Sequence, residues 1–179
     1  MEERINVPQK IGWHFAGFSD GEGSFNVSLK KRDDYRLGWK VELSFNVSQK
    51  DKVILALFKE YLGCGTLRGR SDGVWYYEVT NIKDLSEKIV PFFEKFGFLS
   101  ARKKEAFSKF KDILEIVKDG KHLTNKGLRE IARLREQINE DNSKRKYNAD
   151  EVKNSIKESS ETIRQAPCES QGDDIVRSP

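Results

Sequence analysis

The sequence predicts an α+β fold with one four-stranded antiparallel sheet covered by helices. Two segments, 24–30 and 38–49, alternate apolar and polar residues, as half-buried strands do. A second pair of short strands flanks Asp72-Gly73, a dipeptide typical of β-hairpin turns. Beyond Asn81 the apolar residues recur at helical spacing, so helices complete the fold.

The expected elements follow one another as helix, two strands, helix, two strands and helices. Pro8 suits the first turn of a helix over 8–20, and Asp51 can cap a helix that runs to Leu62. Thr124 is a good N-cap for the last of the expected helices. The remaining elements are hairpin strands over 65–70 and 74–80 and helices near 82–97, 101–118 and 124–138.

Composition divides the chain into a folded domain over 1–139 and a polar C-terminal tail over 140–179, which we expect to be partly helical or disordered. The formal net charge of +4 is too small to indicate a nucleic-acid partner by itself. The tail carries more acidic than basic residues, so the folded part is more basic than the whole chain. No apolar run approaches the roughly 20 residues of a membrane span, and the polar start shows no secretory signal. We therefore expect a soluble, intracellular protein with no membrane partner.

The polar face of the expected sheet is a candidate surface for nucleic acid. Lys, Arg, Asn, Ser and Thr are the side chains that contact base edges and phosphates in a major groove. A solvated sheet face is the alternative interpretation, since many antiparallel sheets have one. The register of the last strand is open, so either Trp75 and Tyr77 or Tyr76 and Glu78 share this face. The candidate DNA-binding residues are Asn26, Ser28, Lys30, Arg32, Lys40, Glu42, Ser44, Asn46, Thr66, Arg68, Arg70, Trp75 and Tyr77.

The most specific segment is 15–25, which reads FAGFSDGEGSF. Within it Gly17 and Gly21 share one helix face, and small residues on one face let two helices approach closely. Asp20 and Glu22 stand at the helix C-terminus, where the helix dipole destabilises a carboxylate by roughly 0.3–1 kcal/mol. A cation would compensate for that cost. Two such helices packed side by side would bring their acids together into a site suited to Mg²⁺.

This segment resembles the signature of the LAGLIDADG homing endonucleases, and the resemblance extends over about 1–139. It implies a saddle-shaped sheet on the DNA major groove and a homodimer built through the motif helix, because a chain with one motif must pair with a second copy. The implied activity is a magnesium-dependent double-strand break with 3′ overhangs in a long, near-palindromic DNA site. The implied dimer interface comprises Trp13, Ala16, Gly17, Asp20 and Gly21.

The same resemblance assigns catalytic roles. Glu22 is the implied metal-binding acid, with Gly21 beside it, and Gln49 corresponds to a polar residue that orients the metal-bound water. Arg102, Lys103 or Lys104 would supply a basic group near the scissile phosphate, and we favour Lys103. Chains of this family act from introns, so an organelle (mitochondrion or chloroplast) or a prokaryotic cytoplasm is the expected location. A maturase that binds its own intron RNA, and a DNA-binding protein without catalysis, are alternatives on the same fold.

Overall fold

The computed structural model describes residues 7–138 and 147–164. The elements are α1 (Gln9–Glu22), β1 (Gly23–Lys31), β2 (Trp39–Gln49), α2 (Lys52–Leu62), β3 (Thr66–Gly69), β4 (Trp75–Val79), α3 (Ile82–Asp84), a π-helical turn η1 (Leu85–Ile89), α4 (Val90–Phe96), α5 (Ala101–Lys118), a 3₁₀ turn η2 (Lys121–Leu123), α6 (Asn125–Glu136) and α7 (Ala149–Arg164). All strand pairs are antiparallel and the order across the sheet is β1-β2-β4-β3. The predicted α+β class and four-stranded antiparallel sheet are therefore confirmed.

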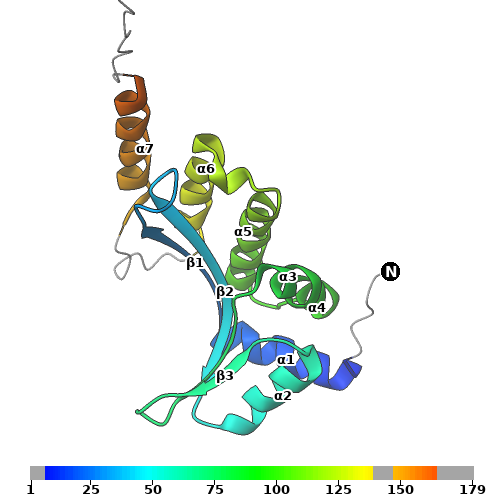
Figure 1. Cartoon of the computed structure of the whole chain (residues 1–179). Helices are drawn as coiled ribbons and strands as arrows, with labels where there is room; N and C mark the ends of the chain where they lie inside the picture. Colours follow the sequence, from blue (N-terminus) through cyan, green and yellow to red (C-terminus); the bar gives the residue numbers. More distant parts are fainter. Residues whose placement is uncertain (1–6, 139–146, 165–179) are drawn as a thin grey trace, which may run out of the picture.

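The sheet is strongly curved, with helices α1 to α6 on its convex side and its concave side open (Figure 1). One face of each strand meets the helices and is apolar, whereas the other is polar. Phe25 of β1 lies at the centre of the core, with its ring between about 5 and 6 Å from those of Phe45, Phe93, Phe98, Phe107 and Phe110. This aromatic cluster joins the sheet to α4 and α5 and gives the open face a rigid support.

Capping residues begin the helices where the sequence predicts. The Asp51 carboxylate accepts a hydrogen bond from the Val53 amide at 2.8 Å, and the Thr124 hydroxyl accepts one from the Gly127 amide at 3.1 Å. The helix expected over 82–97 is instead divided into α3, the π-turn and α4. Pro91, which has no amide hydrogen to donate, stands in the first turn of α4 directly after the π-turn.

The structure differs from the expected polar tail between residues 147 and 156. Val152 and Ile156 of α7 are fully buried, and the Trp39 indole nitrogen donates to the Ser155 hydroxyl at 3.1 Å. The Tyr147 ring meets the Trp39 ring edge-on at 4.9 Å, and α7 lies beside α6 and the far end of β1 and β2 (Figure 1). The change of composition at residue 139 therefore does not mark the end of the packed domain. The rest of the expected tail, 139–146 and 165–179, lies outside the described residues.

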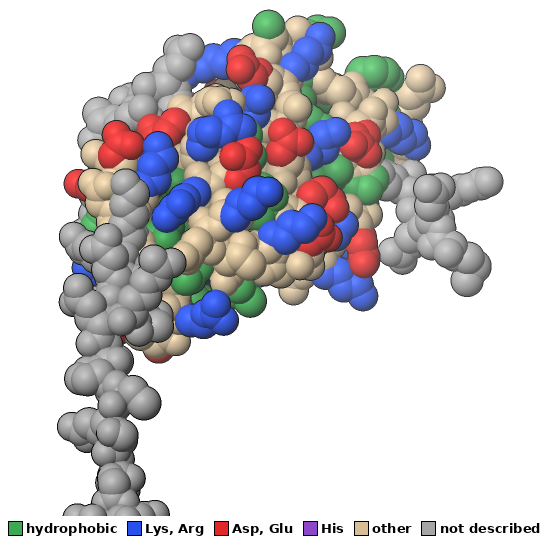
Figure 2. All heavy atoms as spheres, turned by 90° about the horizontal axis from the view of Figure 1, so that it is seen from above, with side chains coloured by type: hydrophobic (Ala, Val, Ile, Leu, Met, Phe, Trp, Pro, Cys, Tyr) green, Lys and Arg blue, Asp and Glu red, His purple; other side chains and the backbone are tan. Residues whose placement is uncertain are grey.

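The outer surface of the helices carries charges of both signs. Figure 2 shows Lys and Arg side chains interspersed with Asp and Glu on the face seen from above. Short-range ion pairs account for part of this mixture, such as Arg133–Glu130 at 2.6 Å and Lys121–Asp119 at 2.7 Å. No helix among the described residues is both long and apolar enough to cross a membrane.

Candidate active site

The C-terminal end of α1 places two carboxylates at the edge of the sheet. The helix continues through Glu22 and passes directly into β1 at Gly23, two residues further than the sequence predicts. A Cβ atom at Gly23 would stand 2.6 Å from the Ser19 carbonyl oxygen, so only glycine permits this close passage from helix to strand. Glu22 is exposed at the last helical position, where the negative end of the helix dipole favours a bound cation.

Asp20 fastens the end of α1 to the start of α5. Its carboxylate accepts hydrogen bonds from the Leu99 amide at 3.1 Å, the Ser100 amide at 3.0 Å and the Ser100 hydroxyl. Partial burial disfavours the charged form, but the hydrogen bonds from Ser100 and Leu99, with the Lys103 charge, outweigh it and lower the pKa of Asp20. Ser100 in turn accepts from the Lys103 amide as the N-cap of α5. The carboxylate of Asp20 is therefore engaged within the chain, and its expected place at a dimer interface stays a prediction.

Lys103 reaches from α5 to the beginning of β1. Its ammonium donates a hydrogen bond to the Gly23 carbonyl oxygen, although the two residues are 80 positions apart. Burial lowers the pKa of Lys103; the nearby Asp20 opposes this effect and Arg102 adds to it. Both basic residues line a hollow of about 340 Å³. Lys104, the third candidate, is exposed and does not line it.

The hollow lies where α1, β1 and α5 meet. Its polar lining offers hydrogen-bond donors beside the exposed end of the motif helix, a suitable place for an anionic group such as a phosphate. The lining residues are Asp20, Gly21, Gly23, Ser24, Phe25, Ser100, Arg102, Lys103, Ala106 and Ile138.

Gln49 is the last residue of β2, on the strand that neighbours β1. Gly23 pairs with Val47, so Gln49 lies two residues beyond the start of β1. Its side-chain oxygen accepts the Lys50 amide at 2.8 Å, which leaves the amide NH₂ as the group that it can offer to a partner. The structure thus places Gln49 near the motif but does not join it to Glu22 by a direct contact.

A metal ion would need ligands from more than one chain or from substrate. The described residues contain no group of three or more His, Cys, Asp or Glu side chains suited to a metal. One chain offers the Glu22 carboxylate and the neighbouring Gly21 carbonyl at the exposed helix end. Mg²⁺ commonly binds through one or two carboxylates together with phosphates and water, so this donor set fits it once a second chain and DNA contribute.

An exposed strip follows α1 on the side away from the core. Trp13 is 52% exposed, and added Cβ atoms at Gly17 and Gly21 would meet nothing within 4 Å. These three residues, spaced by four, can receive a second helix. Ala16 cannot, because it is 2% exposed and packs within the chain, so its predicted place in a dimer interface is wrong. The helical period turns positions 15 and 16 towards the core while 13, 17 and 21 face out.

The strand register shows which residues lie side by side on the open face of the sheet. Ser24, Asn46, Glu78 and Thr66 form one row across all four strands, and Ser48, Tyr76 and Arg68 form the next. The predicted residues that lie on this face are Asn26, Ser28, Lys30, Lys40, Glu42, Ser44, Asn46, Thr66 and Arg68.

The prediction that Trp75 and Tyr77 lie on this face is wrong. Tyr77 pairs with the buried Val47 and is fully buried, and its hydroxyl donates to the Cys64 carbonyl at 3.2 Å. Burial raises its pKa. Tyr76 and Glu78, the alternative pair that the sequence left open, occupy the open face instead. Matching the alternation of β4 to the core of β2 would have found them, because Val79 then joins the apolar side.

Several charged side chains on or beside the open face are held in fixed arrangements. Glu42 lies between Lys30 and Lys40, with N–O distances of 2.5 and 2.9 Å, and these hydrogen bonds lower its pKa. Arg70 donates to the Tyr76 hydroxyl at 2.9 Å and pairs with Asp72 at 3.0 Å. Two predicted residues, Arg32 and Arg70, lie just beyond the ends of β1 and β3, and Arg32 forms two hydrogen bonds to Asp34, at 2.8 and 2.9 Å.

Comparison with known proteins agrees with this arrangement. The family model described as LAGLIDADG endonuclease matches residues 15–114. The "Probable intron-encoded endonuclease 3" of Neurospora crassa is 33% identical over 131 residues, 71% of this chain and 24% of that protein. DNA endonuclease I-CeuI of Chlamydomonas moewusii is 30% identical over 126 residues, 67% of this chain and 58% of that protein. The chain thus spans about a quarter of the first relative's length and rather more than half of the second's.

Solved structures show the same fold in DNA complexes. The archaeal intron-encoded homing endonuclease I-Vdi141I, complexed with DNA, is 30% identical; the match covers 84% of this chain and 96% of that one, with a TM-score of 0.76. I-SmaMI, bound to uncleaved DNA in the presence of calcium ions, is 32% identical over 72% of this chain and 45% of that one, with a TM-score of 0.69.

Proposed function

The chain belongs to the LAGLIDADG endonuclease family, and we propose that it is a site-specific homing endonuclease. It acts as a homodimer and makes metal-dependent double-strand breaks with 3′ overhangs in a long, near-palindromic DNA site. The observation that carries this proposal is the exposed Glu22 at the end of α1, beside a hollow that holds the half-buried Lys103 ammonium.

The residues on and around the end of α1 each have a defined task in this proposal. The Glu22 carboxylate and the Gly21 carbonyl would hold Mg²⁺, and the bound ion would supply water activation and charge neutralisation at the leaving oxygen. Lys103 places a positive charge next to the scissile phosphate, and Arg102, which lines the same hollow, adds a second. The free NH₂ of the Gln49 amide orients a water molecule. Asp20 is not a ligand in this proposal, because its oxygens are already engaged.

Dimerisation follows from the exposed strip of α1. Trp13, Gly17 and Gly21 of one chain pack against the same residues of a second chain, which buries Trp13 and brings the two Glu22 residues together. A two-fold axis between the helices makes the two open sheet faces equivalent. Each dimer therefore binds two related half-sites, which explains the near-palindromic target.

The open face supplies DNA affinity and sequence recognition. Its lysines and Arg68 neutralise phosphates or contact guanine, and its Asn, Ser and Thr side chains contact other base edges. The names of the relatives, which include intron-encoded proteins, support a gene carried by an intron. We place the enzyme in an organelle or a prokaryotic cytoplasm on the same ground.

The test is cleavage of DNA that spans the intron insertion point in the intron-free form of the host gene. We expect double-strand cutting with Mg²⁺, none with EDTA, and none of the allele in which the intron interrupts the site. Absence of cutting together with tight binding to the intron RNA would contradict the proposal and favour a maturase.

A further inference from the structure

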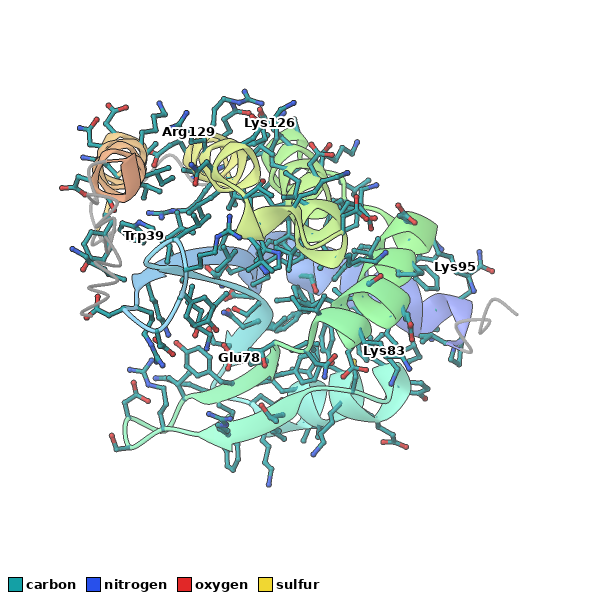
Figure 3. The ribbon with its side chains drawn as sticks, turned by 45° about the horizontal axis from the view of Figure 1, so that its top comes forward. Trp39, Glu78, Lys83, Lys95, Lys126 and Arg129 are labelled. Atoms are coloured by element: carbon teal, nitrogen blue, oxygen red, sulfur yellow. The ribbon has the colours of Figure 1, made fainter. Side chains whose placement is uncertain are left out.

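The open face contains a carboxylate that the roles described so far do not use. Glu78 of β4 stands in the row with Asn46 on one side and Thr66 on the other, near the middle of the sheet. Its side chain forms no ion pair among the described residues, and Thr66 contacts only its backbone carbonyl. Figure 3 labels Glu78 on β4, among the side chains of the neighbouring strands.

Glu42 on the same face provides the contrast. Its charge is neutralised by Lys30 and Lys40, so it costs little when the face approaches phosphates. Glu78 has no such compensation, and an isolated carboxylate on a DNA-binding face is repelled by the phosphate backbone. A polyanion-binding surface can accommodate this charge where the carboxylate accepts a hydrogen bond from the DNA itself.

The chemistry of base edges limits what Glu78 can contact. An ionised carboxylate only accepts hydrogen bonds, and the major groove offers donors at the cytosine N4 and adenine N6 amino groups. Adenine presents the N7 acceptor beside its amino group, which repels a carboxylate, whereas cytosine presents its amino group alone. Cytosine is therefore the preferred partner.

We propose that Glu78 determines specificity by accepting a hydrogen bond from the cytosine N4 amino group at one base pair of each half-site. This inference rests on the proposed function, because it requires that the open face enter a major groove. The two-fold symmetry of the dimer repeats the contact, so the preferred cytosines stand at related positions on the two strands. Asn46 and Thr66 flank the contact and can hydrogen-bond to the adjacent bases.

The neighbouring Arg68 offers a different role for the same carboxylate. Arg68 lies diagonally across from Glu78 on β3 and is exposed. If DNA binding brought the two together, Glu78 would only orient the guanidinium, and the base read at that point would be guanine. The identity of the base lost on mutation separates the two roles.

The experiment is selection of bound sites from a randomised duplex library with the full chain. The wild type should enrich cytosine at one base pair of each half-site, by about tenfold or more over the other bases. Glu78→Gln should lose that preference and keep the others. Glu78→Lys should change it from cytosine to guanine, because an ammonium donates to guanine O6 and N7. Thermal melting of both variants should match the wild type, since the substitutions are on the surface.

Glu42→Gln is the matched control. It should keep the cytosine preference while it raises affinity for random DNA, because Lys30 and Lys40 become free to bind phosphates. The inference is overturned if Glu78→Gln leaves every preference unchanged, or if the lost base is guanine or thymine. A wild type that enriches no sequence at all would instead refute the proposed site-specific function.

Discussion

The burial of α7 makes a strong prediction about stability, which we develop for Ile156→Ala. Ile156 is 1% exposed, so the substitution removes fully buried apolar groups from the contact between α7 and the rest of the chain. Three carbons at about 0.8 kcal/mol each contribute roughly 2.4 kcal/mol, and the residual cavity adds to this. We expect a loss of about 2–4 kcal/mol, equivalent to a fall in Tm of roughly 5–15 °C for a domain of this size.

The assay is urea or thermal unfolding followed by circular dichroism. Asn154→Ala is the matched control, because Asn154 is exposed on the same helix and should change stability by less than about 0.5 kcal/mol. If Ile156→Ala is as stable as the control, α7 does not pack on the core as the structure indicates. Deletion of residues 147–179 should then also leave the melting temperature unchanged, contrary to our expectation of a marked fall.

Three further predictions concern α1 and the sheet. Gly17→Arg should convert the dimer to a monomer in light scattering with no loss of melting temperature, because a side chain there meets nothing in the chain. Gly12→Ala should instead destabilise the fold, since its Cβ would stand 2.1 Å from the ring of Phe96. Asp20→Ala should cost about 1–3 kcal/mol in chemical unfolding and slow cleavage, because Ser100 loses its acceptor and α5 its anchor. The pKa of Glu42 is lowered in the fold, so its stabilising effect is present above its usual pKa of 4.5 and lost as the pH falls through the lowered value; melting curves should separate wild type from Glu42→Gln at neutral pH and converge as the pH falls below 4.5.

The strands and caps were predictable because their signals are local. Alternation in β1 and β2, the Asp51 cap and the Asp72-Gly73 turn each depend on a few adjacent residues. The register of β4 was harder to predict, because Trp75, Tyr76 and Tyr77 are all aromatic and only Glu78 beside Val79 offers a polar contrast. Only pairing with β2 decides that Tyr77 faces the core.

The burial of α7 was hidden for a related reason. Its apolar residues are few, and they contact Trp39 and α6, which are distant in sequence. Composition averages over 140–179 and so conceals two apolar positions, Val152 and Ile156, that are spaced by one helical turn. The helical period could have detected them if it had been applied to that segment alone.

In the candidate site, too, local sequence patterns reveal some features, whereas contacts between distant residues appear only in the structure. The motif alone points to Glu22, whose metal-binding role stays a prediction, and the spacing of Trp13, Gly17 and Gly21 predicts the shared helix face that the structure leaves exposed. The contacts of Asp20 with Ser100 and of Lys103 with the Gly23 carbonyl bring together residues about 80 positions apart. No local pattern contains that information, so only the structure shows that Asp20 anchors the start of α5.

The most direct test of the account is DNA cleavage and binding by Glu22→Gln beside the wild type, with Glu60→Gln as a control at an exposed acid of α2. We predict that Glu22→Gln abolishes cutting with Mg²⁺, binds the target with nearly unchanged affinity and melts at the wild-type temperature, while the control cuts normally. Cutting by Glu22→Gln at the wild-type rate would contradict the central claim that this carboxylate holds the catalytic metal.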